Sequence, residues 1–273
     1  FKTGLDALLS VFDLQEVNHQ GLGEPFMCPD ILKILRYSKS KGLKVWLVTN
    51  ATLITDAIAR ELTEIGVDKI RISVDSADDD LYARIKNKSV LSRVIKSIGL
   101  INGYKHKMKK LSPALAFNTG VLKKNLTKLE NLITLAENTG VNEVTLIPLV
   151  VFSAGMAVQG EQVNFYTKEF QEIFNQLKMK AKGSGIDLNL GISMETKESQ
   201  FCRYGTYVDV AGFVHPCCNI STLTLGSVLR DPAEQIVFNY LKFRHWLDDR
   251  QPICKTCGPL IEAGVSLKEI LKS

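Results

Sequence analysis

No run of apolar residues in the sequence approaches the roughly 20 that a membrane-spanning helix needs. Internal repeats and low-complexity segments are also missing, which excludes a repeat architecture. The formal net charge is only +5, with 23% charged residues, and this is far from the strongly basic balance of a nucleic-acid-binding chain. We therefore expect a globular protein that has neither a membrane nor a nucleic acid as its partner.

Basic residues are concentrated in one run, Lys105–Lys110. No aromatic residue interrupts this run, which lies between a helical stretch and a strand. We interpret it as a solvated loop, with binding of an anionic partner as the alternative.

Cysteine is scarce before residue 200, where Cys28 stands alone, and frequent after it. The other cysteines are Cys202, Cys217, Cys218, Cys254 and Cys257. Disulfide-rich secreted domains are usually shorter than this chain, whereas clustered cysteines in a cytoplasmic protein more often bind metal or perform redox chemistry. We therefore expect a cytoplasmic protein with a metal or redox site.

Residues 1–150 alternate between short apolar runs and amphipathic segments. Near-continuous apolar runs are typical of strands buried on both faces, as in parallel sheets. The candidate strands are Gln15–Gln20, Leu43–Val48, Lys69–Val74, Ala114–Asn118 and Glu143–Leu149. The candidate helices between them are Pro29–Ser40, Asp56–Ile65, Leu81–Ile101 and Leu126–Asn138. Such regular alternation predicts an α/β fold with a parallel sheet or barrel.

The rest of the chain has a different character. Residues 151–200 contain a helix candidate, Tyr166–Lys182, and a strand candidate, Asp187–Ile192, and we interpret them as a bridge between two domains. Residues 201–273 combine the cysteines with a hairpin pattern at Tyr207–Pro216 and helix candidates at Ala233–Asp248 and Leu267–Leu271. They predict a small cysteine-rich α+β domain.

Glycine and polar residues follow the carboxyl ends of the candidate strands, where parallel sheets and barrels bind ligands. These residues are Gly21, Gly23, Glu24 and Pro25 in the segment GLGEP, then Asn50, Ser73 and Asp75. Glycine lets a ligand approach the backbone, and a carboxylate accepts charge-assisted hydrogen bonds from an ammonium group. The amide, hydroxyl and second carboxylate suit ribose hydroxyls or a carboxylate. The pattern indicates a site for a small zwitterion joined to a ribose.

These segments resemble the radical S-adenosylmethionine (radical SAM) enzymes. GLGEP, with the next helix and the strand ending in TN, is similar to the family's Gly-Glu-Pro segment, and IRISVDSADDDLYARIK is similar to its following strand and helix. The resemblance implies a partial (β/α) TIM-like barrel. It also implies that Gly21, Gly23, Glu24 and Pro25 receive the methionine amino group. Asn50, Ser73 and Asp75 would face the ribose and carboxylate side, with Arg84 near the carboxylate.

One feature of that family, a Cys-x3-Cys-x2-Cys loop that holds a 4Fe–4S cluster, is missing from the sequence. No cysteine precedes Cys28, and Phe1–Val11 resembles the helix that follows the loop. We therefore expect that the chain is truncated before the loop and that it is inactive by itself.

The cysteine-rich part resembles the auxiliary-cluster domains of the same family, called SPASM or, when shortened, twitch. VDVAGFVHPCCN is similar to their hairpin, and the further cysteines of the longer SPASM form do not follow Cys257. The resemblance implies one auxiliary 4Fe–4S cluster bound by Cys202, Cys217, Cys254 and Cys257. A cluster needs such a set of converging thiolates.

Other interpretations of the cysteines stay open. A zinc site is one, because CKTCG resembles a zinc knuckle, although fourteen residues separate Cys202 from Cys217 and leave no second knuckle. A thioredoxin-like redox pair is the other. Weaker candidates for ligands are Cys218, Cys28, His215 and His19. We expect His215 to be a surface residue of a strand and His19 to pack beside the strand ends.

The resemblance implies an enzyme that cleaves S-adenosylmethionine to a 5′-deoxyadenosyl radical. This radical would take a hydrogen atom from a peptide, a sugar or a cofactor precursor, with the auxiliary cluster assisting and flavodoxin or ferredoxin as reductant. The domains would be a partial barrel at 1–150, the bridge at 151–200 and the auxiliary domain at 201–273. The alternative is a non-catalytic iron–sulfur or zinc-binding scaffold that retains the barrel.

Overall fold

The computed structural model describes residues 1–21, 23–88, 90–149, 160–191, 205–216 and 223–248. These residues belong to two compact units. The larger consists of Gln15–Leu149 with Val158–Gly191, and the smaller contains Phe1–Leu14 and Ile192–Ser273. Within the described ranges, no helix has the length and apolar character required to span a membrane.

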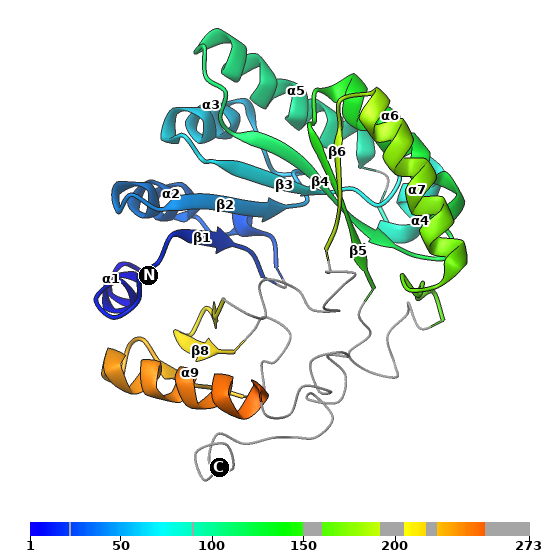
Figure 1. Ribbon diagram of the computed structural model, residues 1–273. Coiled ribbons are helices and arrows are strands. Elements are labelled where there is room, and N and C mark those ends of the chain that lie inside the picture. The colour runs from blue at the N-terminus through cyan, green and yellow to red at the C-terminus, as the bar shows by residue number, and fades with distance from the viewer. Residues whose placement is uncertain (22, 89, 150–159, 192–204, 217–222, 249–273) are drawn as a thin grey trace. The chain divides into compact units, whose positions relative to one another are not determined.

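The larger unit is built on a parallel sheet of six strands (Figure 1). The strands are β1 (Glu16–His19), β2 (Lys44–Thr49), β3 (Lys69–Ser73), β4 (Ala114–Val121), β5 (Glu143–Pro148) and β6 (Asp187–Leu190). They pair in chain order, and every pair is parallel. The predicted α/β fold with a parallel sheet is therefore confirmed.

Helices lie along one face of this sheet (Figure 1). They are α2 (Ile31–Ser40), α3 (Asp56–Ile65), α4 (Asp79–Lys86), α5 (Leu91–Lys107), α6 (Leu129–Thr139) and α7 (Lys168–Gly183). Alternate strand residues such as Val45, Leu47, Ile70, Ile72 and Phe117 are fully buried. Because successive side chains of a strand point to opposite faces, this apolar set forms the core between the sheet and the helices.

Helix ends follow local chemistry that the sequence carries. Thr55 Oγ1 accepts a hydrogen bond from the Ile58 N–H at 3.3 Å and caps α3. Gly66 then ends α3 with φ of 73°, and Gly140 ends α6 with φ of 69°. Glycine adopts this left-handed conformation without steric cost, so these positions stop the helices at defined residues.

The single helix expected at Leu81–Ile101 is two helices, α4 and α5. Asp78 caps α4 by accepting a hydrogen bond from the Leu81 N–H at 2.8 Å, and Asn87 ends it with φ of 55°. Asparagine tolerates this left-handed conformation better than most residues do. The sequence did not predict the break between α4 and α5, because no glycine or proline stands there.

The loop expected at Lys105–Lys110 is helical in its first half, because α5 continues to Lys107. Cations in the last turn of a helix interact favourably with its carbonyl end. Lys110 Nζ donates to the carbonyls of Thr63 and Glu64, each at 3.0 Å, at the end of α3. The basic run therefore stabilises two helix ends.

The described part of the segment expected as a bridge extends the sheet instead. Strand β6 pairs with β5 in parallel register, with Asp187 opposite Glu143. Helix α7 precedes it and buries Phe170, Leu177 and Ala181. An amphipathic helix followed by a strand adds one more helix–strand repeat to a parallel sheet.

The smaller unit has an α+β structure in its described residues. Strands β7 (Tyr207–Val208) and β8 (Phe213–His215) form the expected antiparallel hairpin, and β9 (Gly226–Ser227) pairs antiparallel with β8. Helix α9 (Ala233–Asp248) has the expected bounds. The helix expected at Leu267–Leu271 lies outside the described residues.

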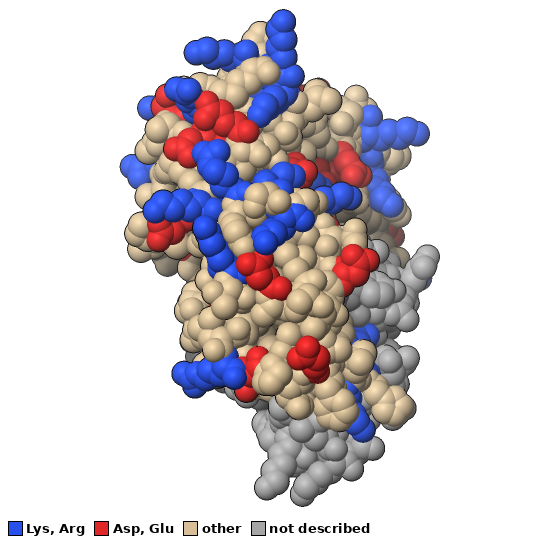
Figure 2. Space-filling model, turned by 90° about the vertical axis from the view of Figure 1, so that its left-hand side faces the viewer, with Lys and Arg blue, Asp and Glu red and all other residues tan. Residues whose placement is uncertain are grey.

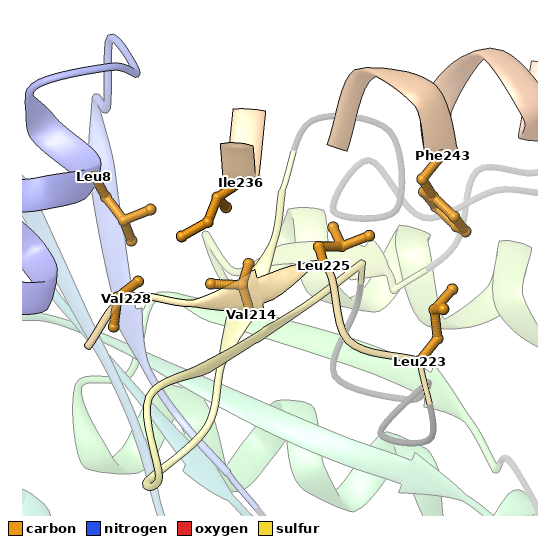
Figure 3. Close-up of a cluster of buried hydrophobic side chains, with 7 residues drawn as sticks. All are labelled: Leu8, Val214, Leu223, Leu225, Val228, Ile236 and Phe243. Atoms are coloured by element: carbon orange, nitrogen blue, oxygen red, sulfur yellow. The ribbon is translucent and has the colours of Figure 1, made fainter. Parts of the chain in front are cut away.

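A hydrophobic cluster joins the first helix, α1 (Lys2–Leu9), to this unit (Figure 3). Its buried members are Leu8, Val214, Leu223, Leu225, Val228, Ile236 and Phe243. A Cβ added to Gly4 of α1 would lie 2.7 Å from Val228 Cγ2, so the helix and Val228 are in close contact. The start of the chain, expected to belong to the barrel, thus packs with residues from the C-terminal part.

Lys and Arg side chains gather in groups on the face shown in Figure 2, with Asp and Glu side chains among and beside them. Ion pairs of the described surface include Lys39 with Asp68 at 2.7 Å and Arg60 with Glu64 at 2.8 Å. Each surface pair of this kind contributes little stability. Because the pairs combine both signs of charge, this surface does not have an electrostatic potential of a single sign.

Candidate functional site

The carboxyl ends of all six strands lie at one edge of the sheet, because every pair is parallel. We call this edge the rim. The loop after β1 brings Gly21, Gly23, Glu24 and Pro25 to the rim, and the ends of β2 and β3 bring Asn50, Ser73 and Asp75. Of the predicted cofactor residues, Arg84 alone lies in an α-helix, α4.

The Glu24 carboxylate joins the loop after β1 to the end of β2. Its Oε1 accepts a hydrogen bond from Thr49 Oγ1 at 2.5 Å, and its Oε2 accepts one from the Asn50 N–H at 2.8 Å. Oε1 also lies 3.4 Å from the Phe26 N–H, at the start of the short 3-10 helix η1 (Pro25–Met27). Proline suits this first helical position because it has no N–H to satisfy. Glu24 therefore fixes the GLGEP loop in place.

The backbone of the same loop is open at Gly23. A Cβ built there would meet no atom within 4 Å, and Gly21 is exposed. An open backbone lets a ligand reach peptide carbonyls, which accept hydrogen bonds from an ammonium group. This part of the rim therefore fits the amino-acid portion of S-adenosylmethionine.

Asn50 uses its carbonyl oxygen within its own turn. The oxygen accepts hydrogen bonds from the Thr52 N–H at 2.9 Å and from Thr52 Oγ1 at 2.6 Å. This is the local bonding by which asparagine fixes turns. The amide NH₂ group of Asn50 is then the part that can donate to a ligand hydroxyl or carboxylate.

Ser73 and Asp75 differ in the burial of their side chains and in the bonds that these side chains make. Ser73 is half-buried at the end of β3, beside Asn118 of β4. The buried Asp75 carboxylate accepts a hydrogen bond from the Gly120 N–H at 2.8 Å, and its other oxygen lies 2.6 Å from Lys86 Nζ. Asp75 thus holds the loop after β4 and a cation from α4.

Arg84 is exposed, and its Nε donates to the Asp80 carbonyl at 3.4 Å. Lys86 is the residue of α4 that pairs with a rim residue. Two residues along a helix are about 200° apart around its axis, so Arg84 and Lys86 lie on different sides of α4. The buried residues of α4 are Leu81 and Tyr82. Helical spacing from these two residues is the sequence signal that distinguishes the position of Lys86 from that of Arg84.

His19 ends β1 at the rim, and its Nε2 lies 3.2 Å from Ser38 Oγ of α2. Burial lowers the pKa of His19 from 6.5 to about 4, because a desolvated imidazole disfavours its charged form. His19 is therefore neutral at neutral pH.

In the part of the chain that the structure describes, no group of three or more His, Cys, Asp or Glu side chains is placed to bind a metal ion. Cys28 is exposed and free. The four residues predicted to bind the auxiliary cluster are Cys202, Cys217, Cys254 and Cys257. They lie outside the described residues, and so does Cys218.

The expectation that His215 is a surface residue is wrong, since it is 3% exposed. Its Nδ1 lies 2.9 Å from the Leu223 carbonyl oxygen, and its Nε2 lies 3.2 Å from Asp209 Oδ2. The side chain closes the hairpin onto the following segment, and buried polar groups of this kind need such partners.

The face of the sheet opposite the helices, which we call the inner face, is polar. Neighbouring strands place side by side Asn18 and Trp46, Trp46 and Lys69, and Ser73 and Asn118. Sequence reasoning missed this face because IRISV was treated as one apolar run. The alternation of Lys69, Arg71 and Ser73 with isoleucines was the available signal.

The parallel six-stranded α/β sheet, with an open glycine loop and polar strand ends, has the form of a partial barrel. The family model of the radical SAM superfamily matches residues 7–147, more than half of the chain. The chain belongs to the radical SAM superfamily.

Relatives with assigned activities include enzymes. An AdoMet-dependent heme synthase of Methanosarcina barkeri is 26% identical over 86% of this chain and 72% of its own length. A probable GTP 3′,8-cyclase of Sulfurisphaera tokodaii is 36% identical, but over 46% of this chain and 39% of its own length.

Solved structures share the fold at low identity. Streptococcus suis SuiB bound to S-adenosylmethionine has a TM-score of 0.61 at 15% identity, over 81% of this chain and 55% of its own. Native anSMEcpe with bound AdoMet and a peptide has a TM-score of 0.63 at 15% identity, over 86% and 70%. The chain thus spans just over half of SuiB and well under half of the cyclase.

Proposed function

We propose that this chain is the S-adenosylmethionine-binding part of a radical SAM enzyme. The observation that carries the proposal is the Glu24 carboxylate, which joins the open GLGEP loop to Thr49 and Asn50 at the end of the next strand. When bound, S-adenosylmethionine and a reducing 4Fe–4S cluster supply a 5′-deoxyadenosyl radical that takes a hydrogen atom from the substrate.

The residues of this chain bind and orient the cofactor. The Gly21 and Gly23 carbonyls and Glu24 receive the methionine ammonium group, and Pro25 sets the turn. The Asn50 NH₂ group and the Ser73 hydroxyl bond the ribose or the carboxylate. Asp75 acts by positioning, because its carboxylate already bonds Gly120 and Lys86. Arg84 is the weakest member of the set, because it is exposed and bonds within its own helix.

The substrate class that we favour is a cofactor precursor. The heme synthase of Methanosarcina barkeri aligns over 86% of this chain, whereas the cyclase aligns over 46%. The peptide-bound structures resemble the chain in fold alone, at 12–16% identity. Peptides and sugars are the alternatives.

A twitch-like auxiliary 4Fe–4S cluster, bound by Cys202, Cys217, Cys254 and Cys257, is the second part of the proposal. It is supported by the spacing of these cysteines and by the hairpin at β7 and β8. A flavodoxin or ferredoxin as reductant, and a cytoplasmic location, complete the proposal.

Titration of the chain with S-adenosylmethionine by calorimetry tests cofactor binding. Glu24→Gln should weaken binding by about tenfold to hundredfold, because a charge-assisted hydrogen bond is lost and the loop loosens. Glu61→Gln is the control, since Glu61 is an exposed carboxylate paired with Arg36 at 3.0 Å. Equal affinity of Glu24→Gln and the unchanged chain would contradict the proposal.

An assay of the complete gene product under reducing conditions distinguishes the enzyme from the alternative, a non-catalytic scaffold. Formation of 5′-deoxyadenosine from S-adenosylmethionine with dithionite supports the enzyme. Tight binding without cleavage, in protein with a full complement of iron and sulfide, would favour the scaffold.

A further inference from the structure

The inner face contains an arginine, Arg71, whose Nε has no hydrogen-bond partner among the described residues. Arg71 lies in β3, between Val48 of β2 and Ala116 of β4. Its Nε is also buried. A buried donor without a partner costs free energy, and native structures rarely keep one without a purpose.

The nearest carboxylate, Glu143, is already engaged. Its Oε2 lies 2.6 Å from Lys69 Nζ, and its Oε1 accepts a hydrogen bond from Thr145 Oγ1 at 3.2 Å. Arg71 Nη2 lies 3.9 Å from Oε1, too far for a hydrogen bond. Lys69 and Glu143 cancel in charge, and Arg71 remains, so the cluster has a net charge of +1.

The geometry keeps the Arg71 guanidinium in position. Its Cζ lies 4.7 Å from the centre of the Trp46 ring, and Lys69 Nζ lies 5.0 Å from the same ring. Stacking on an aromatic face orients an arginine without using its N–H donors. The residue beside Arg71 on the neighbouring strand is Ala116, whose side chain is small.

An acceptor without a partner lies on the neighbouring strand. Asn118 Oδ1 in β4 is buried and has no hydrogen-bond partner among the described residues. Asn118 lies two residues beyond Ala116, the residue beside Arg71. The inner face thus offers a fixed cationic donor and, one step nearer the rim, a neutral acceptor.

We propose that the inner face binds one carboxylate of the substrate through Arg71, while Asn118 accepts a hydrogen bond from a neighbouring N–H or O–H of the same molecule. This inference rests on the proposed function, whose substrate it places below the cofactor. Arg71 lies two residues before the end of β3, which is about 6–7 Å below the Ser73 level. A single carboxylate balances the net charge of +1, whereas a triphosphate would leave the partly buried cluster strongly negative.

Metal-free protoporphyrin IX, a tetrapyrrole dicarboxylate, tests the subsite against its dimethyl ester, which has no carboxylate. Quenching of tryptophan fluorescence reports binding, because Trp46 lies beneath Arg71. The acid should bind at least tenfold more tightly than the ester and than GTP. Arg71→Gln should abolish this preference, and Arg60→Gln, a change at an exposed arginine paired with Glu64, should preserve it. Equal binding of acid and ester by the unchanged chain, or an unchanged preference in Arg71→Gln, would overturn the proposal.

Thermal unfolding of the ligand-free chain gives a second readout that needs no ligand. Removing a buried donor that has no hydrogen-bond partner among the described residues should raise the unfolding temperature of Arg71→Met, whereas loss of a purely structural arginine should lower it. A lowered temperature would overturn the proposal.

Titration of the Arg71 variants with S-adenosylmethionine keeps the two proposals apart. Unchanged cofactor affinity in Arg71→Gln is expected, and a matching loss would assign Arg71 to the cofactor and overturn the substrate subsite. Failure of the cofactor to bind any variant, with the acid preference intact, would instead refute the proposed function alone.

Discussion

Glu24 shows how one side chain at the rim can serve both the fold and a ligand. Its two oxygens accept hydrogen bonds from Thr49 and Asn50, yet an ionised carboxylate has about four lone-pair positions. The protein bonds therefore orient the group without exhausting it. Thr49 also accepts a hydrogen bond from the Ala51 N–H at 2.9 Å, so a small network sets the geometry of the whole turn.

His19 gives a pH-dependent prediction at the same scale. Its folded-state pKa, about 4, is below its ordinary value of 6.5, so in the window between them the unfolded chain binds more protons than the folded one. Stability is fully present above about pH 6.5 and is lost as the pH falls towards 4. By this linkage the loss from His19 at about pH 5 is about 2 kcal/mol.

The measurement is the free energy of unfolding by urea, compared between about pH 7.5 and about pH 5. His19→Gln removes the titrating group, and its pH dependence should be smaller by about that amount. His106→Gln, in the last turn of α5, is the matched control. A pH dependence that stays the same in His19→Gln would refute the assigned pKa shift.

At the scale of elements, the strands divide the larger unit into an apolar and a polar side. Ile70 and Ile72 are fully buried on the helix side of β3, while Lys69, Arg71 and Ser73 alternate with them. Fully apolar strands would suit a sheet covered on both faces by hydrophobic layers. The alternation therefore makes the inner face polar, and this is the face at which we propose that the substrate binds.

Glycines in two helices give opposite predictions. Gly4→Ala in α1 gains about 1 kcal/mol of helix propensity, but its Cβ would lie 2.7 Å from Val228 Cγ2. Overpacking against a stiff β-branched side chain costs about 1–3 kcal/mol. We expect a net loss, seen as faster hydrogen exchange in β8, β9 and α9.

Gly99→Ala in α5 is the matched change, because a Cβ there meets no atom within 4 Å and the residue is exposed. It should stabilise the larger unit by about 1 kcal/mol, measured as a higher urea midpoint. Unaltered exchange of the smaller unit in Gly4→Ala would show that α1 does not depend on the contact with Val228.

At the scale of the whole molecule, the two units have separate hydrophobic cores. The smaller one buries Leu8 of α1 together with residues of β8 and α9 and with residues that flank β9. So small a core supplies limited stability, and a metal site adds binding free energy that becomes folding free energy. The hairpin and α9 should therefore be weakened, but not abolished, when the proposed auxiliary cluster is lost.

Iron analysis after anaerobic reconstitution tests the proposed auxiliary cluster. The chain should bind about four irons and four sulfides, and Cys254→Ala and Cys257→Ala should each lose them. Cys218→Ala and Cys28→Ala should retain them, the latter because Cys28 is exposed and free. Stoichiometric zinc in place of iron would contradict the cluster, and full iron in Cys254→Ala would show that the ligands are others.

The sequence alone determined the order and kind of most elements, because apolar periodicity, capping residues and glycine stops act locally. It predicted α3 and α9 with the bounds observed, and it placed the GLGEP, Asn50 and Ser73 positions at strand ends. The tertiary structure alone decided what depends on contacts distant in the chain. These are the packing of α1 with the C-terminal part, the pairing of the sixth strand with β5, and the bonds by which Glu24 and Asp75 hold neighbouring loops. Arg71 belongs to the same group. Its Nε has no hydrogen-bond partner among the described residues, and Glu143, which lies 3.9 Å from its Nη2, is paired with Lys69, 74 positions away in the chain, which no local pattern encodes.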